Sequence, residues 1–223
     1  MQTLIKSELW FSHKYDEGFA ERYHQSREER LARRWANYWE IGMARKSLRL
    51  AGNPRSVLDV PCGTGRFWPM LAEDATRQLL AADSSRAMIG AALRNQPPEV
   101  AERFQVFQTD ALAIELPDNA VENVFCMRLM HHLHDPESRI RVYREFARVS
   151  SNTVCVSLRV SGNFGAWRRQ RRHQIQNKRV VNRNVLDPQQ AERELREAGL
   201  RIVGHVDLLS YCSMWRTYIA ALE

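Results

Sequence analysis

The sequence predicts an α/β fold built around a sheet of seven strands. Short apolar runs alternate with longer segments in which apolar residues recur every three or four positions, and this alternation is typical of strands joined by helices. The first apolar run, 56–60, leads directly into a glycine turn at 62–65 and then into a helical pattern. A strand, a tight turn and a helix in this order form the unit that binds ligands in many α/β proteins.

Composition indicates one ordinary globular domain. The chain has 223 residues, of which 44% are hydrophobic and 26% charged, so a sizeable core can be buried. No apolar run approaches the roughly 18–20 residues that a membrane span requires. The N-terminal residues carry an acid early and no long apolar segment, so they do not predict a secretory signal.

The cysteines indicate the cellular compartment of the protein, and its net charge indicates the kind of partner it binds. The four cysteines are far apart and show no zinc-binding spacing, so we expect reduced thiols, a cytoplasmic protein and no metal site. The formal net charge of +7 favours acidic partners such as phosphate, nucleic acid or an anionic lipid surface, without choosing among them.

The elements follow one another along the chain in a regular order. The pattern from Lys14 to Ala51 is helical, with a plausible break at 25–26. Asp135-Pro136 and Asp187-Pro188 each place a capping acid before a proline, which is a helix start signal. The expected strands are 56–60, 79–82, 104–108, 121–127, 154–158, 200–208 and 214–222, and the expected helices between them include 64–74, 85–95 and 189–198. We expect turns at 96–99 and at 150–152.

The glycine turn departs from the dinucleotide-binding fingerprint. That fingerprint needs a third glycine three residues after the second, and Trp68 stands there, which argues against a pyrophosphate crossing the turn. What remains is Asp59 at the strand end, the pair Gly63 and Gly65, and Asp83 at the end of the next strand, near the position of a ribose-binding acid.

This arrangement resembles motif I of the class I S-adenosylmethionine (SAM) dependent methyltransferases, a D-x-x-x-G-x-G core, and the order of elements from Ser56 to Glu223 is similar to that family. The resemblance implies a Rossmann-like methyltransferase fold. Its sheet is mostly parallel, with an antiparallel last strand and helices on both faces. A single domain, 1–223, would comprise an N-terminal helical lid (1–51), a SAM-binding core (52–158), a basic insertion (159–187) and a C-terminal helix with a strand hairpin (188–223).

The resemblance also implies roles for individual residues around SAM. Gly63 and Gly65 would let the backbone meet the cofactor, and Asp59 would orient its amino group. Asp83 would hold the ribose, although an acid there can instead cap the following helix. The remaining expected cofactor contacts are Asp110 with Ala111 at the adenine (Asp110 would otherwise cap a turn), Met88 or Phe67 on the adenine ring, and Pro61, Ser84 and Met127.

A pair of histidines follows the fourth expected strand. His131 and His132 lie in a run similar to the family's motif IV, beyond the carboxyl end of the strand, where ligands bind in open α/β sheets. The usual acid near the start of that strand appears here as Glu122 or Asn123, a departure from the family. The histidines would act as a general base or would only shape the loop.

The remaining candidate residues concern the acceptor. Trp167 precedes Arg168, Arg169, Arg171 and Arg172 in a segment whose acidic residue is Asp187. Arginines pair carboxylate or phosphate groups, so the segment is either an anion site or a solvated basic helix. Tyr15 and Tyr23 resemble aromatics of the family's lids, or they attach the N-terminal helices to the sheet.

These features predict an enzyme that moves the methyl group of SAM to a small-molecule, glycan or lipid-linked acceptor with anionic groups. Two alternatives stay open: an RNA methyltransferase, and a non-catalytic SAM-fold module that binds an anionic nucleotide or partner through its arginines. No Asn/Asp-Pro-Pro-Tyr/Phe run is present, which argues against the common amino-methylating DNA enzymes. Nucleic acid is therefore a possible but less favoured partner, peripheral membrane contact stays possible, and the sequence does not specify the oligomeric state.

Overall fold

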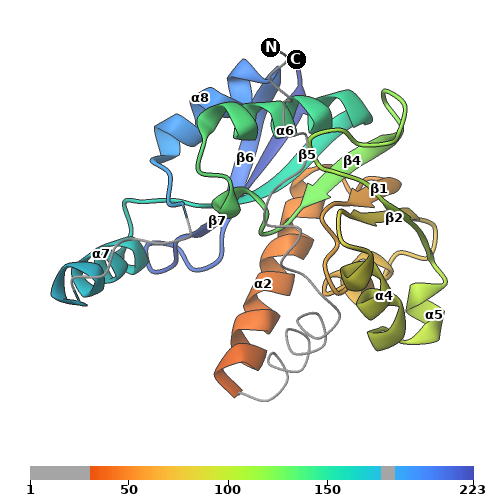
Figure 1. Ribbon diagram of the computed structural model, residues 1–223, viewed down its shortest axis with the longest axis horizontal. Helices are drawn as coiled ribbons and strands as arrows, with labels where there is room; N and C mark the ends of the chain where they lie inside the picture. Colours follow the sequence, from red (N-terminus) through yellow and green to blue (C-terminus); the bar gives the residue numbers. More distant parts are fainter. Residues whose placement is uncertain (1–30, 177–183) are drawn as a thin grey trace, which may run out of the picture.

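The computed structural model describes residues 31–176 and 184–223, with side chains described from residue 35 to residue 171 and from residue 184 onward. Tyr15, Tyr23 and the expected helix break at 25–26 lie outside the described residues, and the side chain of Arg172 is also outside them. The described chain forms an α/β structure around one seven-stranded sheet, in the order β3-β2-β1-β4-β5-β7-β6 (Figure 1).

The sheet confirms the predicted topology. Its strands are β1 (Ser56–Asp59), β2 (Gln78–Asp83), β3 (Phe104–Gln108), β4 (Val121–Cys126), β5 (Ser150–Arg159), β6 (Leu200–Asp207) and β7 (Trp215–Leu222). Strands β1 to β5 pair in parallel, whereas β7 runs antiparallel to both β5 and β6. The last strand is therefore the antiparallel one, and β6 and β7 form a hairpin at the sheet edge.

The helices differ from the expectation mainly in length. They are α2 (Leu31–Leu50), α3 (Trp68–Leu71), α4 (Arg86–Asn95), α5 (Pro98–Ala101), the 3₁₀ turn η2 (Met130–His132), α6 (Pro136–Val149), α7 (Phe164–Gln176) and α8 (Pro188–Glu197). The helix expected at 64–74 shrinks to α3, because Gly63 and Gly65 both have positive φ and keep the chain in a turn. A short helix, α5, replaces part of the turn expected at 96–99, and α6 runs directly into β5 without the turn expected at 150–152.

Two hydrophobic clusters cover the two faces of the sheet. On one face, Met43, Ala44 and Leu48 of α2 pack with Trp68 and with inward-facing residues of the strands. On the other face, α6 and α8 cover the sheet through Tyr143, Phe146 and Leu195, among others. Alternating inward and outward residues of the central strands supply both clusters, so the sheet is buried between helices as its parallel pairing requires. None of the described helices is long and apolar enough to cross a membrane.

Candidate cofactor and acceptor site

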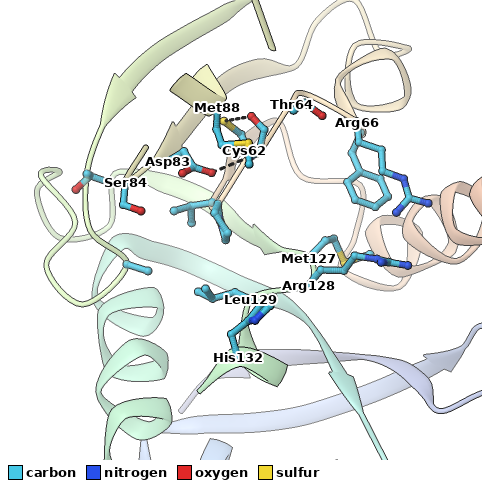
Figure 2. A pocket seen from close by; sticks show the side chains of 16 residues that line it. Cys62, Thr64, Arg66, Asp83, Ser84, Met88, Met127, Arg128, Leu129 and His132 are labelled. Atoms are coloured by element: carbon cyan, nitrogen blue, oxygen red, sulfur yellow. Dashed lines mark hydrogen bonds between the residues drawn. The ribbon is translucent and has the colours of Figure 1, made fainter. Parts of the chain in front are cut away.

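The main cleft lies at the carboxyl ends of the central strands. The chain runs outward through β1, β2 and β3 and then returns to β4 on the other side of β1, so the strand order reverses between β1 and β4. A ligand site is expected at such a switch point. The cleft is lined by Val60, Pro61, Cys62, Gly63, Thr64, Arg66, Phe67, Asp83, Ser84, Met88, Thr109, Ala111, Met127, Arg128, Leu129 and His132 (Figure 2).

The glycine turn has an open wall and a packed base. Gly63 has φ +55°, and a Cβ added there would meet no atom within 4 Å, so a ligand can approach its backbone. Gly65 has φ +72°, and a Cβ added there would lie 3.0 Å from the Trp68 ring and 3.2 Å from Ala92. Trp68 is fully buried and stacks on Phe104 at 4.3 Å between ring centroids. The tryptophan at the third glycine position thus fills the core beneath the turn.

Asp83 connects the end of β2 to the glycine turn. Its carboxylate accepts hydrogen bonds from the backbone N–H of Gly63 at 3.0 Å and of Ser85 at 2.9 Å. Burial raises the pKa of this carboxyl to about 6, even though the backbone hydrogen bonds act to lower it. The cap of α4 comes from Ser85, whose hydroxyl accepts from the N–H of Met88. Asp83 lines the cleft and does not cap that helix.

Asp59 lies beneath the cleft and does not line it. Its carboxyl is 1% exposed, and neither oxygen has a hydrogen-bond partner within the described part of the chain. Burial, followed by the charge of Asp83, raises the pKa of Asp59 well above its ordinary value, and the Trp68 indole opposes this shift. Since Asp59 does not line the cleft, its carboxyl would reach a ligand amine only through water.

The adenine end of the predicted site differs from the expectation in detail. Asp110 does not line the cleft, and its carboxylate accepts from the N–H of Leu112 at 2.9 Å, as in the capped turn that we left open. Its neighbours Thr109 and Ala111 line the cleft instead. Gly65 is likewise absent from the lining, whereas Pro61, Ser84, Met88 and Met127 belong to it.

The two histidines have different surroundings. His132 lines the cleft, as Figure 2 shows at the end away from Asp83. His131 is buried, with its ring 5.1 Å from that of Trp215 in an edge-on contact and 4.0 Å from that of His132. Of the two, His132 is the one placed to meet a ligand.

A buried carboxylate that the sequence analysis missed organises the other end of the cleft. Glu40 of α2 forms ion pairs with the guanidinium groups of Arg66, after the glycine turn, and Arg128, after β4. Burial acts to raise the pKa of Glu40, but the two arginines outweigh it and the pKa is lowered. This contact joins positions 40, 66 and 128, and no spacing rule connects such distant positions.

Arg128 also faces the acceptor side of the sheet. Its backbone has φ +66° and its N–H donates to the Ser157 hydroxyl at 2.7 Å, which fixes the loop after β4 against β5. The guanidinium carbons of Arg128 and Arg159 lie 4.7 and 4.6 Å from the centroid of the Trp215 ring. Cation–π contacts of this kind favour a defined guanidinium position. The end of the cleft near Arg128 is therefore cationic.

The predicted acceptor residues of α7 lie apart from the cleft. Arg168 and Arg169 line a separate hollow with Gly165 and Cys212–Trp215. Trp167 is 51% exposed, and Arg171 stacks on its ring at 5.4 Å. The two regions meet at Trp215, which lines the hollow and contacts Arg128 of the cleft.

Comparisons with known proteins agree with this geometry. The sequence profile of a family described as a methyltransferase domain matches residues 57–152. Malonyl-[acyl-carrier protein] O-methyltransferase of Hahella chejuensis is 30% identical over 167 residues, which cover 73% of this chain and 56% of that protein. The chain thus spans little more than half the length of this curated relative.

Solved structures share the fold. Magnesium protoporphyrin IX methyltransferase from Synechocystis PCC 6803, with bound S-adenosylhomocysteine (SAH), superposes with a TM-score of 0.74 at 15% identity, over 96% of this chain and 97% of that one. A possible histamine N-methyltransferase from Thermotoga maritima superposes with a TM-score of 0.64 at 14% identity, over 96% of this chain and all of the other. The Synechocystis enzyme has also been solved with SAM.

The fold, the open glycine turn and the acid at the end of β2 define a SAM-binding α/β domain. With the profile match and the structural likenesses, they show that the chain carries a methyltransferase domain of the class I SAM-dependent kind, for which SAM is the cofactor. The residues present fit that cofactor, because Gly63 leaves room at its backbone and Asp83 offers acceptor oxygens in the cleft.

Proposed function

We propose that the chain methylates a carboxylate oxygen of an anionic acceptor, a small molecule or a glycan- or lipid-linked compound, to form a methyl ester. The observation that carries this proposal is the Arg128 guanidinium in the cleft wall, held by Glu40 and Trp215. Glu40 accepts hydrogen bonds from the Nε and Nη2 of this guanidinium, so its Nη1 is the group that would donate to a carboxylate oxygen of the acceptor. It would hold the acceptor with an oxygen directed at the methyl group.

The residue of the cleft lining that could act as a base at this end is His132, and a carboxylate acceptor does not require one. Asp83 is the one carboxylate among the described residues that line the cleft, and it belongs to the glycine turn. Burial, with the charges of Asp83 and Asp59, raises the pKa of the Cys62 thiol well above its usual value, so this thiol stays neutral. A carboxylate acceptor is already ionised at neutral pH and needs no base.

The chemistry needs alignment more than proton transfer. Bound SAM supplies a methyl group that is activated by its sulfonium. The acceptor oxygen forms a bond to this methyl carbon as the carbon–sulfur bond breaks, which leaves a methyl ester and SAH without releasing a proton. The protein's part is to align the two groups and exclude water. In our proposal the glycine turn and Asp83 hold the cofactor, Arg128 orients the acceptor, and His132 lies beside it.

The named relative is consistent with a carboxylate acceptor. The Hahella protein is described as an O-methyltransferase of malonyl-[acyl-carrier protein], and a malonyl thioester ends in a free carboxylate. From this likeness we carry over only the carboxylate as the group that is methylated. The RNA alternative has less support, because the described α7 arginines line a hollow apart from the cleft.

The test is transfer of labelled methyl from SAM to a panel of carboxylic acids that includes malonyl thioesters and sugar acids, with the matching amides as controls. The expected product is a methyl ester, which releases methanol in mild alkali. Arg128→Gln should raise the KM for the acceptor about tenfold or more, from the loss of a charged hydrogen bond. Because the change also removes one partner of Glu40, SAH affinity is measured alongside to show that the cleft stays folded. Arg144→Gln, on the exposed surface of α6, is the control. An alkali-stable product, or equal transfer to the amides, contradicts the proposal.

We further propose that the protein works in the cytoplasm. All four cysteines are free thiols, and Cys62, Cys126 and Cys155 are buried. Burial raises the pKa of Cys155 to about 12, so it stays a neutral core thiol, as in proteins of a reducing compartment. Labelling of cell fractions with an antibody to the chain tests this, and recovery outside the cytoplasm would contradict it.

A further inference from the structure

Helix α7 carries an exposed aromatic and cationic surface that the proposed reaction does not use. Phe164, Trp167 and Tyr211 are 56%, 51% and 86% exposed. The rings of Phe164 and Trp167 lie 5.5 Å apart, and Arg171 stacks on Trp167. We call these four residues, with Arg168 and Arg169, the α7 surface. Large aromatic side chains that gather on a surface mark an interaction site more often than scattered ones do.

The N-terminal end of α7 is held in place by hydrogen bonds and close packing, so the helix presents its aromatic side chains in a defined position. The Asn163 side chain caps the helix by accepting from the N–H of Ala166 at 2.9 Å. The N–H of Phe164 donates to the carbonyl of Tyr211 at 2.9 Å. At Gly165 an added Cβ would come within 2.7 Å of the Cys212 carbonyl, so the helix approaches the 208–214 loop as closely as only glycine allows. The helix and the loop thus present their aromatic residues together.

The charge of this segment has one sign. Between Val160 and Leu186 the sequence contains no aspartate or glutamate, whereas α7 carries Arg168, Arg169 and Arg171 among its described side chains. Some exposed arginines elsewhere pair with acids, as Arg144 does with Glu197 and Arg196 with Glu192. The segment therefore attracts an anionic partner.

We propose that the α7 surface docks on the anionic headgroups of a phospholipid bilayer. Phe164, Trp167, Arg168 and Arg171 follow one another at three- and four-residue steps, so aromatic area and cations share one side of α7. Tryptophan, tyrosine and phenylalanine contribute apolar area at the depth of a membrane interface, while nearby arginines contact lipid phosphates. Figure 1 shows α7 projecting from the sheet with its helices, so a planar surface can reach it without meeting the central strands.

Charge and shape favour a bilayer over an acidic protein. The three exposed aromatic residues stand around a shallow hollow on a projecting helix, and a fluid lipid surface adapts to such a convex shape. Docking would also place the bilayer near the acceptor end of the site, since Arg168 and Arg169 share a hollow with Trp215 and Trp215 contacts Arg128. The inference stands without the proposed carboxylate chemistry.

The experiment is co-sedimentation of the full chain with vesicles of phosphatidylcholine alone or mixed with phosphatidylglycerol, at low and high salt. We expect binding to the mixed vesicles that weakens at high salt, and little binding to pure phosphatidylcholine. Arg168→Gln with Arg171→Gln should lower the partition coefficient roughly 25-fold, at about fivefold for each arginine near an anionic surface. Trp167→Ser should lower it roughly tenfold, because a buried aromatic side chain contributes apolar area.

Matched variants keep the test specific. Arg144→Gln with Arg196→Gln removes two exposed arginines elsewhere, and Trp35→Ser removes a tryptophan that is 65% exposed on α2. Both should leave vesicle binding unchanged, and every variant must keep wild-type SAH affinity as evidence of folding. No binding to anionic vesicles overturns the proposal and leaves an acidic protein as the partner to seek. Equal binding to both vesicles, or a loss with Trp35→Ser and not with Trp167→Ser, also overturns it. None of these outcomes bears on methyl transfer, which is assayed without lipid.

Discussion

The Asp83 carboxylate accepts a 3.0 Å hydrogen bond from the backbone N–H of Gly63, so the acid that ends β2 and the glycine turn that follows β1 form one unit. Without a ligand, the acid holds the turn in shape. With SAM bound, we expect the same carboxylate to accept from the ribose hydroxyls. The two tasks compete for one charged group, which makes the protonation of Asp83 a control point for cofactor binding.

Cofactor affinity should fall in mild acid. Burial raises the pKa of Asp83 to about 6, so the carboxylate is ionised at neutral pH and becomes protonated as the pH falls below this value. The protonated acid is a weaker acceptor, and SAH affinity should drop toward about tenfold per pH unit below the pKa if binding needs the ionised form. Calorimetric titration across this range measures it. The Asp83→Asn variant should bind weakly with a flatter pH profile, and an unchanged slope in that variant would refute the assignment.

Asp59 should lower the stability of the ligand-free protein at neutral pH. Its pKa is raised by burial and by the Asp83 charge, so the folded state holds the proton more tightly than the unfolded chain does. Stability is therefore highest below the unfolded pKa and is lost as the pH rises toward the folded value. We expect Asp59→Asn to raise the free energy of unfolding at neutral pH by about 1 kcal/mol or more and to weaken SAH binding. Urea unfolding and calorimetry measure the two effects, and a destabilised variant with intact affinity would contradict this account.

The two glycines of the turn should respond differently to alanine. Gly65→Ala combines a positive φ with a Cβ 3.0 Å from the buried Trp68 ring, so it should cost about 2–3 kcal/mol of stability. Gly63→Ala has a positive φ but open space around the added Cβ. Its stability cost should be smaller, about 1 kcal/mol, while SAH affinity should fall more than about tenfold, because the methyl group occupies the ligand's approach. Thermal unfolding measures the stability of the two variants and calorimetry their SAH affinity. A larger stability loss in Gly63→Ala, or a larger loss of SAH affinity in Gly65→Ala, would contradict this prediction.

Glu40 should contribute far more stability than an exposed acid with the same kind of partner. Its carboxylate is buried between Arg66 and Arg128, and removing one partner of a buried ion pair costs about 3 kcal/mol or more. Because its pKa is lowered, this contribution is present above the ordinary glutamate pKa and is lost as the pH falls below it. We therefore expect Glu40→Gln to lose about 3 kcal/mol at neutral pH.

The control for Glu40 is Glu73, which pairs with Arg45 through side chains that are about half exposed. Glu73→Gln should cost no more than about 0.5 kcal/mol. Urea unfolding of both variants at neutral and acidic pH is the measurement. Equal losses in the two variants would show that burial of the Glu40 pair has no special effect.

The sheet could be predicted because each of its strands is a local apolar run ended by turn residues. All seven runs became strands, and the alternation of strands with helices led to the parallel order. The helix expected at 64–74 failed, because positive φ at Gly63 and Gly65 outweighed the apolar period. Ser85 capped α4 as its residue type allows, which leaves Asp83 facing the cleft.

The candidate site could be predicted only where its residues follow a strand or belong to a motif. Pro61, Gly63, Asp83 and Ser84 reach the cleft from the ends of neighbouring strands, and Met88 reaches it from the first turn of α4. The Glu40 contact with Arg66 and Arg128, and the Trp215 contact with Arg128 and Arg159, join distant positions through tertiary packing. Neither periodicity nor a motif indicates such contacts.

The central claim is that the glycine turn and Asp83 form a SAM site, and a calorimetric titration of the full chain with SAH tests it most directly. The account predicts one site per chain with micromolar affinity for SAH. This affinity should fall at least about tenfold in Asp83→Ala and stay unchanged in Glu99→Ala, on the exposed surface of α5. No binding by the wild-type chain, or equal binding by the wild-type and Asp83→Ala proteins, would contradict it.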